Sequence, residues 1–183
     1  MQSAKIKLQI EESMSDSTEK TTEFIVLSMG SNIGDREENI NRAFGLLKDT
    51  KAISSAAISS YYETEPVGKL EQQWFLNVAV TGSTSLSLYN FIEICKSIEY
   101  AIGRKKRKKW DAREIDIDIL LFGNKIFRSG QIIIPHIGMH ERKFVLVPAA
   151  EIAGNAVHPV FGKTINELLD ECKDDSKVIR YKC

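Results

Sequence analysis

The chain has 183 residues, 43% of them hydrophobic and 27% charged, so it can bury the core of one globular domain without disulfides or metal staples. Basic and acidic residues are equal in number, 25 each, and the three cysteines stand at wide spacing, which excludes a disulfide framework and a CxxC zinc or redox site. No apolar run approaches the ~20 residues of a membrane span, and the N-terminus has no secretory signal. We therefore expect a cytoplasmic protein that binds no membrane.

The sequence of the first half of the chain predicts three strands and two helices. Residues 1–22 are polar and lack a sustained period, so we predict a disordered extension before a single domain over 23–183. A strand is predicted over 24–29, followed by a helix whose Asp35 and Glu38 resemble a capping box. Further strands are predicted over 52–62 and 75–80, and a second helix over 86–102 that ends at Gly103.

The second half predicts another strand and several short elements. Residues 114–122 alternate apolar side chains with Glu114, Asp116 and Asp118, which predicts a half-buried strand. A tight turn at 123–124 predicts a hairpin into 125–127, a strand is expected over 131–134, and short helices are expected around 145–151 and 164–171. The order βαββαβ predicts a ferredoxin-like α+β sandwich, with two helices on one face of an antiparallel sheet, an open face for a site, a C-terminal hairpin and short helices.

The pair Asp116 and Asp118 is the strongest candidate site in the sequence. Residues two apart on a strand project from the same face, and two carboxylates about 7 Å apart repel by roughly 2–3 kcal/mol at an effective dielectric near 20. Either cations neutralise the pair or it faces open water. Mg²⁺ commonly binds one or two carboxylates together with substrate phosphates, so the first alternative predicts a metal site.

A run of six basic residues, 104–109, precedes this strand. Without it the chain has 19 basic and 25 acidic residues, so positive charge is concentrated in one segment. Such a run suits a compact, highly charged anion, although a solvated charged loop is the alternative. Together with Trp110, Arg113 and the two aspartates, it supplies the residue types that phosphoryl transfer needs.

Other segments offer contacts for a planar ring. Phe75 and Asn77 share one face of the strand over 75–80, where an aromatic ring can stack on a heterocycle and an amide can bind its edge. The alternative is a core phenylalanine and a locally bonded asparagine. His136 and Arg142 are further candidates for nucleotide contacts, although a lone histidine is more often structural.

Taken together, these segments resemble the 6-hydroxymethyl-7,8-dihydropterin pyrophosphokinase family of the folate pathway. The resemblance covers about residues 24–169, and its order and spacing are specific. It is carried by Gly30-Ser31-Asn32, by residues 60–68 (SYYETEPVG), 75–80 (FLNVAV), 98–104 (IEYAIGR), 110–123 (WDAREIDIDILLFG), 134–136 (IPH) and 142–146 (RKFVL).

The resemblance implies transfer of pyrophosphate from the co-substrate ATP to the pterin hydroxymethyl group, with AMP as the other product. By analogy, Asp116 and Asp118 bind two Mg²⁺ ions, and Arg104 and Arg113 assist transfer. It further implies a nucleotide site of Glu99, Lys106, Trp110, Arg113, Ile119, His136 and Arg142. The implied pterin site comprises Thr64, Pro66, Val67, Phe75, Asn77 and Phe144, with the two phenylalanines on either side of the ring.

This chain departs from the family pattern at several positions outside the two aspartates. Residues 111–114 read Asp-Ala-Arg-Glu where the family usually has Gly-Pro-Arg-Thr, and Glu65 replaces a common proline. Phe75 is often tyrosine, and Gln131 stands where some members carry an arginine. The activity class therefore follows more firmly from the resemblance than the individual nucleotide contacts do.

Two other functions fit a ferredoxin-like sheet. An RNA-binding module would need exposed aromatic ribonucleoprotein motifs, which the sequence lacks, and two acids on its face would repel phosphate. A regulatory domain that binds a small ligand without catalysis is the second alternative. The expected partners are the small molecules ATP and the pterin, with no nucleic acid, and the chain is expected to be a monomer or a homodimer.

Overall fold

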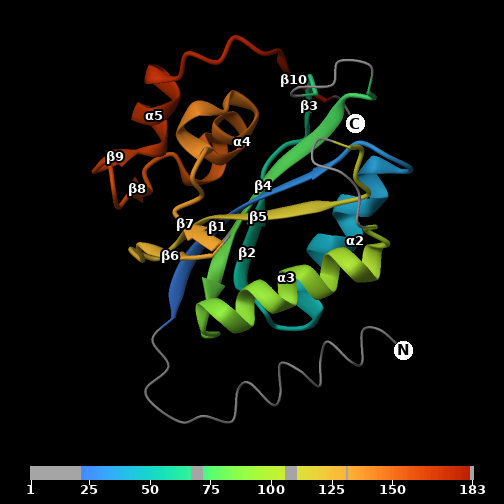
Figure 1. The fold of residues 1–183 in the computed structure, drawn as a ribbon, viewed down its shortest axis with the longest axis horizontal. Coiled ribbons are helices and arrows are strands. Elements are labelled where there is room, and N and C mark those ends of the chain that lie inside the picture. Colours follow the sequence, from blue (N-terminus) through green and yellow to red (C-terminus); the bar gives the residue numbers. More distant parts are fainter. Residues whose placement is uncertain (1–21, 67–71, 106–110, 131, 182–183) are drawn as a thin grey trace.

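The computed structural model describes residues 22–66, 72–105, 111–130 and 132–181. The extension predicted over residues 1–22 lies outside this part, apart from Thr22. The described residues form a mixed α+β structure, in which helices pack on a central antiparallel sheet (Figure 1).

The central sheet has six strands. β10 (Val178–Arg180), β3 (Tyr62–Thr64), β4 (Phe75–Thr84), β1 (Glu23–Ser31) and β5 (Asp116–Phe122) pair in that order, and β2 (Ser54–Ile58) also pairs with β4. Each pairing is antiparallel. β1 and β4, at the centre, are almost entirely buried, which is why they read as apolar runs in the sequence.

Two helices cover one face of the sheet, as predicted. α2 (Arg36–Asp49) begins where Asp35 accepts a hydrogen bond from the Glu38 N–H at 3.0 Å, and α3 (Leu88–Ile102) ends at Gly103 in the left-handed region. Their apolar stripes meet one side of the strands, with Ile40, Phe91 and Leu76 among the fully buried side chains. This layer is the main core (Figure 1).

The opposite face is not open over its whole length. α4 (Lys143–Ala153) and α5 (Ile165–Glu171) bury a second core against it, which includes Val26, Ala79 and Leu120 (Figure 1). These three side chains are apolar on the face that the sequence assigned to a site, so a helix covers them. Only the end of this face that carries Asp116 and Asp118 remains available.

Three strand predictions need correction. The strand expected over 52–62 is two strands, because the Ala79 N–H donates to the Ser59 hydroxyl instead of a backbone partner at the break. The hairpin from 122 into 125–127 does not form, since the free edge of β5 accepts a hydrogen bond from the His136 N–H at the Leu120 carbonyl. After residue 143 the sequence predicts short helices, yet this part also contains strands, β10 among them.

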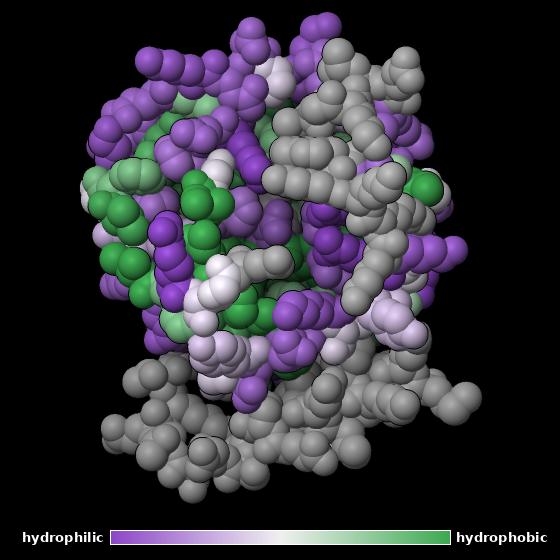
Figure 2. Space-filling model, in the orientation of Figure 1, coloured by the Kyte–Doolittle hydropathy of each residue, from purple (hydrophilic) through white to green (hydrophobic). Residues whose placement is uncertain are grey.

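The remaining elements lie beside the sheet. β6 (Phe127–Ser129) pairs with β7 (Ile132–Ile134), β8 (Val157–His158) pairs with β9 (Lys163–Thr164), and a 3₁₀ helix spans Met139–Glu141. In Figure 2 apolar side chains gather at the left of the view, over these two hairpins, where Ile126, Ile137 and Val160 are more than half exposed. This apolar surface adjoins the polar end of the sheet at His136.

Candidate active site

The two aspartates of β5 lie opposite the glycine and serine of β1. Asp116 pairs in register with Gly30, and Asp118 pairs with Ser28. The small partners leave space above the sheet at this end, because neither fills the volume over the neighbouring strand. The aspartates therefore border cavities instead of packed core.

A first cavity, of about 260 Å³, lies above this end of the sheet. It gathers side chains from β1, β3, β4, β5 and the start of α4. Nine of the predicted site residues line it: Thr64, Phe75, Asn77, Arg113, Asp116, Asp118, His136, Arg142 and Phe144. Residues predicted for the pterin and residues predicted for metal and nucleotide thus meet in one cavity.

A second cavity, of about 380 Å³, lies at the free edge of β5, between α3 and β7. Seven predicted residues line it: Glu99, Arg104, Arg113, Asp116, Asp118, Ile119 and His136. The two cavities share Arg113, Asp116, Asp118 and His136. The aspartates therefore stand on the boundary between two spaces of substrate size.

Two arginines hold Asp116 from both sides. Arg104 Nη1 lies 2.8 Å from Asp116 Oδ1 and also pairs with Glu99, while Arg113 pairs with Asp116 Oδ2. Glu99, buried on α3, also accepts a hydrogen bond from the Ile117 N–H at 2.8 Å. Burial raises the pKa of Glu99 to about 7, against the lowering effect of Arg104. Acids and arginines thus form one chain across the second cavity.

Asp118 is the second aspartate of the pair, and its carboxyl group is perturbed by its surroundings. Burial and the neighbouring Asp116 carboxylate both raise the pKa of Asp118, because each disfavours its charged form. Burial also lowers the pKa of His136, against the raising effect of the Asp118 carboxylate. The expected repulsion between the two carboxylates is therefore present at the site, and a cation between them would relieve it.

The far wall of the first cavity is held by a buried hydrogen bond. Asn77 Nδ2 donates to Thr64 Oγ1 at 2.7 Å, and both residues are almost fully buried. Gly30 lies directly beneath: a Cβ there would stand closer than 3.0 Å to Asn77 Oδ1. Glycine at this position therefore leaves room for the Asn77 amide, a role that the Gly30-Ser31-Asn32 motif alone did not reveal.

Asn32 joins the two loops that border the first cavity. Its amide donates to Gln72 Oε1 and to the Gln73 carbonyl, both at 3.2 Å, and its Oδ1 accepts from the Arg113 N–H at 2.7 Å. The Asn32 side chain thus affects the first cavity by positioning Arg113 and Gln72, which line it. Sequence reasoning identified the motif but not this linking role, because the partners lie 40 and 81 residues away.

Several lining residues were not predicted. In the first cavity these are Ser28, Gly30, Glu65, Gln72 and Asp111, and in the second they include Ile92, Cys95, Lys96 and residues 132–134. Ile92 and Cys95 are buried on α3, and no local signal in the sequence placed them at a cavity. Pro66 is buried and lines neither cavity, while Val67, Lys106, Trp110 and Gln131 lie outside the described residues.

The donor set fits Mg²⁺ as a pair of carboxylates. Within the described ranges, no three His, Cys, Asp or Glu side chains gather closely enough to hold a metal ion by themselves. Mg²⁺ does not need such a cage, since it usually combines one or two carboxylates with substrate phosphates and water. Asp116 and Asp118, on the boundary of two cavities, match that requirement.

Comparisons with known proteins place the chain in a family. The family model described as 7,8-dihydro-6-hydroxymethylpterin-pyrophosphokinase (HPPK) matches residues 26–154. The chain is 44% identical over 126 residues to the 2-amino-4-hydroxy-6-hydroxymethyldihydropteridine pyrophosphokinase of Bacillus subtilis, covering 69% of this chain and 75% of the relative. The protein of the same name from Methylorubrum extorquens is 41% identical over 143 residues, covering 78% and 89% respectively.

Longer proteins contain a matching region. A folate synthesis bifunctional protein of Arabidopsis thaliana is 39% identical over 139 residues, which cover 76% of this chain but 25% of that protein. A solved Plasmodium falciparum HPPK-DHPS, crystallised with pterin and p-hydroxybenzoate, matches with a TM-score of 0.64 at 18% identity, covering 85% of this chain and 42% of that one. This last likeness concerns the fold alone.

The class of protein is a pyrophosphokinase domain, and in this structure two adjoining cavities lie at one end of its sheet. The chain belongs to the 7,8-dihydro-6-hydroxymethylpterin-pyrophosphokinase family, and it is an enzyme of folate biosynthesis. Among the described residues, no helix combines the length and apolar character that crossing a membrane requires.

Proposed function

We propose that the chain transfers pyrophosphate from ATP to the hydroxymethyl oxygen of 6-hydroxymethyl-7,8-dihydropterin. The observation that carries this proposal is the position of Asp116 and Asp118 on the wall shared by the two cavities. A reaction between two substrates needs their reacting atoms side by side, and positioning them contributes much of the rate. The family membership supports the same reaction.

The pterin occupies the first cavity. Phe75 and Phe144 line it and offer aromatic faces for the ring, while Asn77 and Thr64 offer an amide and a hydroxyl to its polar edge. Pro66 and Val67 are assigned to this site by the family resemblance. The ring is then held by its faces and edge, with its hydroxymethyl group toward the aspartates.

The nucleotide occupies the second cavity, with its triphosphate toward the shared wall. Glu99, Ile119 and His136 line this cavity and are proposed contacts, together with Lys106, Trp110 and Arg142, the last of which lines the adjoining first cavity. Ile119 lies among apolar lining residues that include Ile92 and Ile134, a surface suited to a flat base. The acidic and basic side chains near Asp116 suit the phosphates.

When ATP binds, the guanidinium groups of Arg104 and Arg113 exchange their contacts with Asp116 for contacts with the phosphates. Both arginines contact the Asp116 carboxylate in this structure. Asp116 and Asp118 would hold two Mg²⁺ ions, which supply positive charge to the triphosphate and acidify the attacking hydroxyl. The freed guanidiniums then offset negative charge that develops on phosphate oxygens during transfer.

The bond changes balance without a further reactant. The pterin hydroxymethyl oxygen attacks the β-phosphorus of ATP and loses its proton, and the bond from that phosphorus to the α-β bridging oxygen breaks. AMP leaves with the bridging oxygen, and the β- and γ-phosphates remain on the pterin. The arginines and aspartates bind and orient these groups but form no covalent bond with them.

The test is AMP formation from ATP, measured with and without the dihydropterin and Mg²⁺. We expect AMP only when all three are present, and we expect Asp118→Asn to lower kcat at least about a hundredfold, since one site charge is lost. Asp170→Asn, on the exposed surface of α5, is the matched control and should retain full activity. Near-normal turnover by Asp118→Asn would refute the metal assignment.

The order β3–β4–β1–β5, with α2 and α3 on one face, supports a ferredoxin-like arrangement within one domain over 23–183. We propose that this domain acts in the cytoplasm as a monomer or homodimer. Light scattering of the purified chain would distinguish the two oligomeric states. A non-catalytic regulatory domain would bind the pterin without forming AMP, so the same assay decides against it.

A further inference from the structure

The last described segment of the chain, residues 172–181, runs from α5 past the start of α4 to β3. We call this segment the C-terminal strap. It ends as β10, where Val178 pairs with Thr64 and Arg180 pairs with Tyr62 (Figure 1). The strap lies beyond residues 26–154, which the family model matches. It contacts two elements that form different walls of the first cavity.

The first contact fixes the start of α4. Its N-cap residue, Arg142, has no acceptor in its side chain and makes no capping hydrogen bond. Instead Asp174 Oδ2 accepts from the Lys143 N–H at 2.8 Å, while Asp174 Oδ1 accepts from the Ser176 N–H at 3.0 Å. A carboxylate is favourable at the positive end of a helix. The strap therefore supplies the cap that α4 lacks, directly beside Arg142 and Phe144.

The second contact fixes the end of β3. The Lys177 N–H donates to Glu65 Oε2 at 3.0 Å, the Glu65 N–H donates to the Lys177 carbonyl at 3.4 Å, and Lys177 Nζ lies 3.6 Å from Glu65 Oε1. Glu65 lines the first cavity and follows Thr64, the partner of Asn77. A proline at position 65, common in the family, could not donate the second of these bonds.

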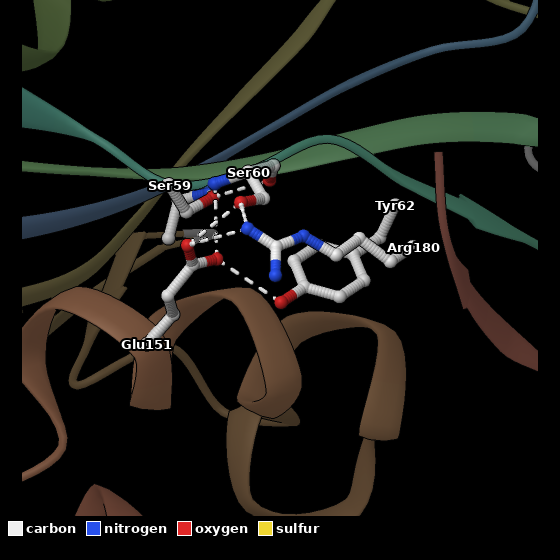
Figure 3. Close-up of polar contacts among 6 residues, drawn as sticks. Ser59, Ser60, Tyr62, Glu151 and Arg180 are labelled. Atoms are coloured by element: carbon white, nitrogen blue, oxygen red, sulfur yellow. Dashed lines mark hydrogen bonds and ion pairs between the residues drawn. The ribbon is translucent and has the colours of Figure 1, made fainter. Parts of the chain in front are cut away.

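A third group of contacts joins the same two elements from the other side. Glu151 of α4 accepts hydrogen bonds from the Ser60 N–H at 2.9 Å, from the Ser60 hydroxyl at 2.7 Å and from the Tyr62 hydroxyl at 3.0 Å (Figure 3). Arg180 of the strap donates to Ser60 Oγ at 2.6 Å. Figure 3 shows these side chains converging between the helix and the strands. The strap thus contacts α4 and β3 both beside the first cavity, through Asp174 and Lys177, and near Glu151, through Arg180.

We propose that Asp174 and Lys177 are positioning residues that hold Arg142 and Phe144, at the start of α4, at a fixed separation from Thr64 and Glu65, at the end of β3. The distance between these two walls of the first cavity determines how tightly the cavity binds a flat ring. The strap therefore sets affinity for the pterin far more than affinity for ATP, since neither residue lines the second cavity and Arg142 is the proposed nucleotide contact that lies beside the strap. This inference rests on the proposed function, which assigns the first cavity to the pterin.

The test compares Asp174→Ala, Asp174→Asn and a matched control, Asp175→Ala, whose wild-type side chain is exposed. For Asp174→Ala we expect KM for the dihydropterin to rise roughly tenfold, with KM for ATP and kcat within about twofold of wild type. Asp174→Asn should lie between, because one amide oxygen can replace only one of the two carboxylate acceptors. Asp175→Ala should match wild type.

Two results would overturn the inference: an unchanged KM for the dihydropterin in Asp174→Ala, or an equal loss in both KM values and in kcat. If Asp174→Ala fails to fold, hydrogen exchange on wild type decides. The amides of Lys143, Ser176 and Lys177 should gain protection when the dihydropterin binds, and unchanged exchange would refute the proposal. Failure of the proposed function gives a different result, because wild type itself would then form no AMP from the dihydropterin.

Discussion

Replacing Gly30 with alanine should selectively damage the pterin cavity. The new Cβ would stand closer than 3.0 Å to Asn77 Oδ1, 3.4 Å from Asn77 Cγ and 3.7 Å from Phe75 Cδ1. The Asn77 amide cannot yield without cost, because it is buried and donates to Thr64 at 2.7 Å. Moving it leaves buried polar groups unpaired, which costs about 1–3 kcal/mol.

This cost converts into a measurable change in affinity. Since 1.4 kcal/mol corresponds to a factor of ten, we expect KM for the dihydropterin to rise about 5- to 140-fold. KM for ATP should change little, because Gly30 does not line the nucleotide cavity. The assay is steady-state AMP formation with each substrate varied in turn, and it is accompanied by thermal unfolding of each variant.

Gly45→Ala is the matched control. Gly45 lies within α2, and a Cβ there meets nothing within 4 Å. Both changes restrict the unfolded chain equally, but Gly45→Ala should raise stability by up to about 1 kcal/mol through helix propensity. If Gly30→Ala showed a normal KM for the dihydropterin and the same stability gain as Gly45→Ala, the close approach of Gly30 and Asn77 would not matter as argued.

Two further predictions concern stability. Ser59→Ala leaves the buried Ala79 N–H without its 2.9 Å acceptor, so the free energy of unfolding should fall by about 1–3 kcal/mol in urea titrations, whereas exposed Ser85→Ala should not change it. Burial raises the pKa of Glu151, but hydrogen bonds from Ser60 and Tyr62 outweigh burial, so the net effect is a lowered pKa. The charged Glu151 side chain therefore stabilises the fold above about pH 4.3, and this stabilisation is lost as pH falls through the lower folded-state pKa. Burial and the Glu151 bond raise the pKa of Tyr62, so that contribution is lost as pH rises above about 10. Glu151→Gln should flatten both limbs of the stability–pH curve, and an unchanged curve would contradict the role of this cluster.

The site could be anticipated only in part. The spacing of Asp116 and Asp118 put both carboxylates on one strand face, and the structure brings to the same two cavities most of the described residues that the resemblance implied. Which arginine contacts which acid was not predictable. Arg104 reaches Glu99 and Asp116 from beyond the end of α3, and that geometry depends on how α3 packs against β5.

The sequence by itself determined the local elements. Alternation over residues 114–122, the Asp35–Glu38 cap and the glycine after α3 each act within a few residues, so their patterns are readable without the fold. Tertiary structure decided which edges pair and which helix covers the second face. The cap on α4 comes from Asp174, 31 residues away, and β10 pairs with a strand more than 110 residues earlier. Such contacts leave no periodic signal, because their partners become neighbours only when the chain has packed around its two cores.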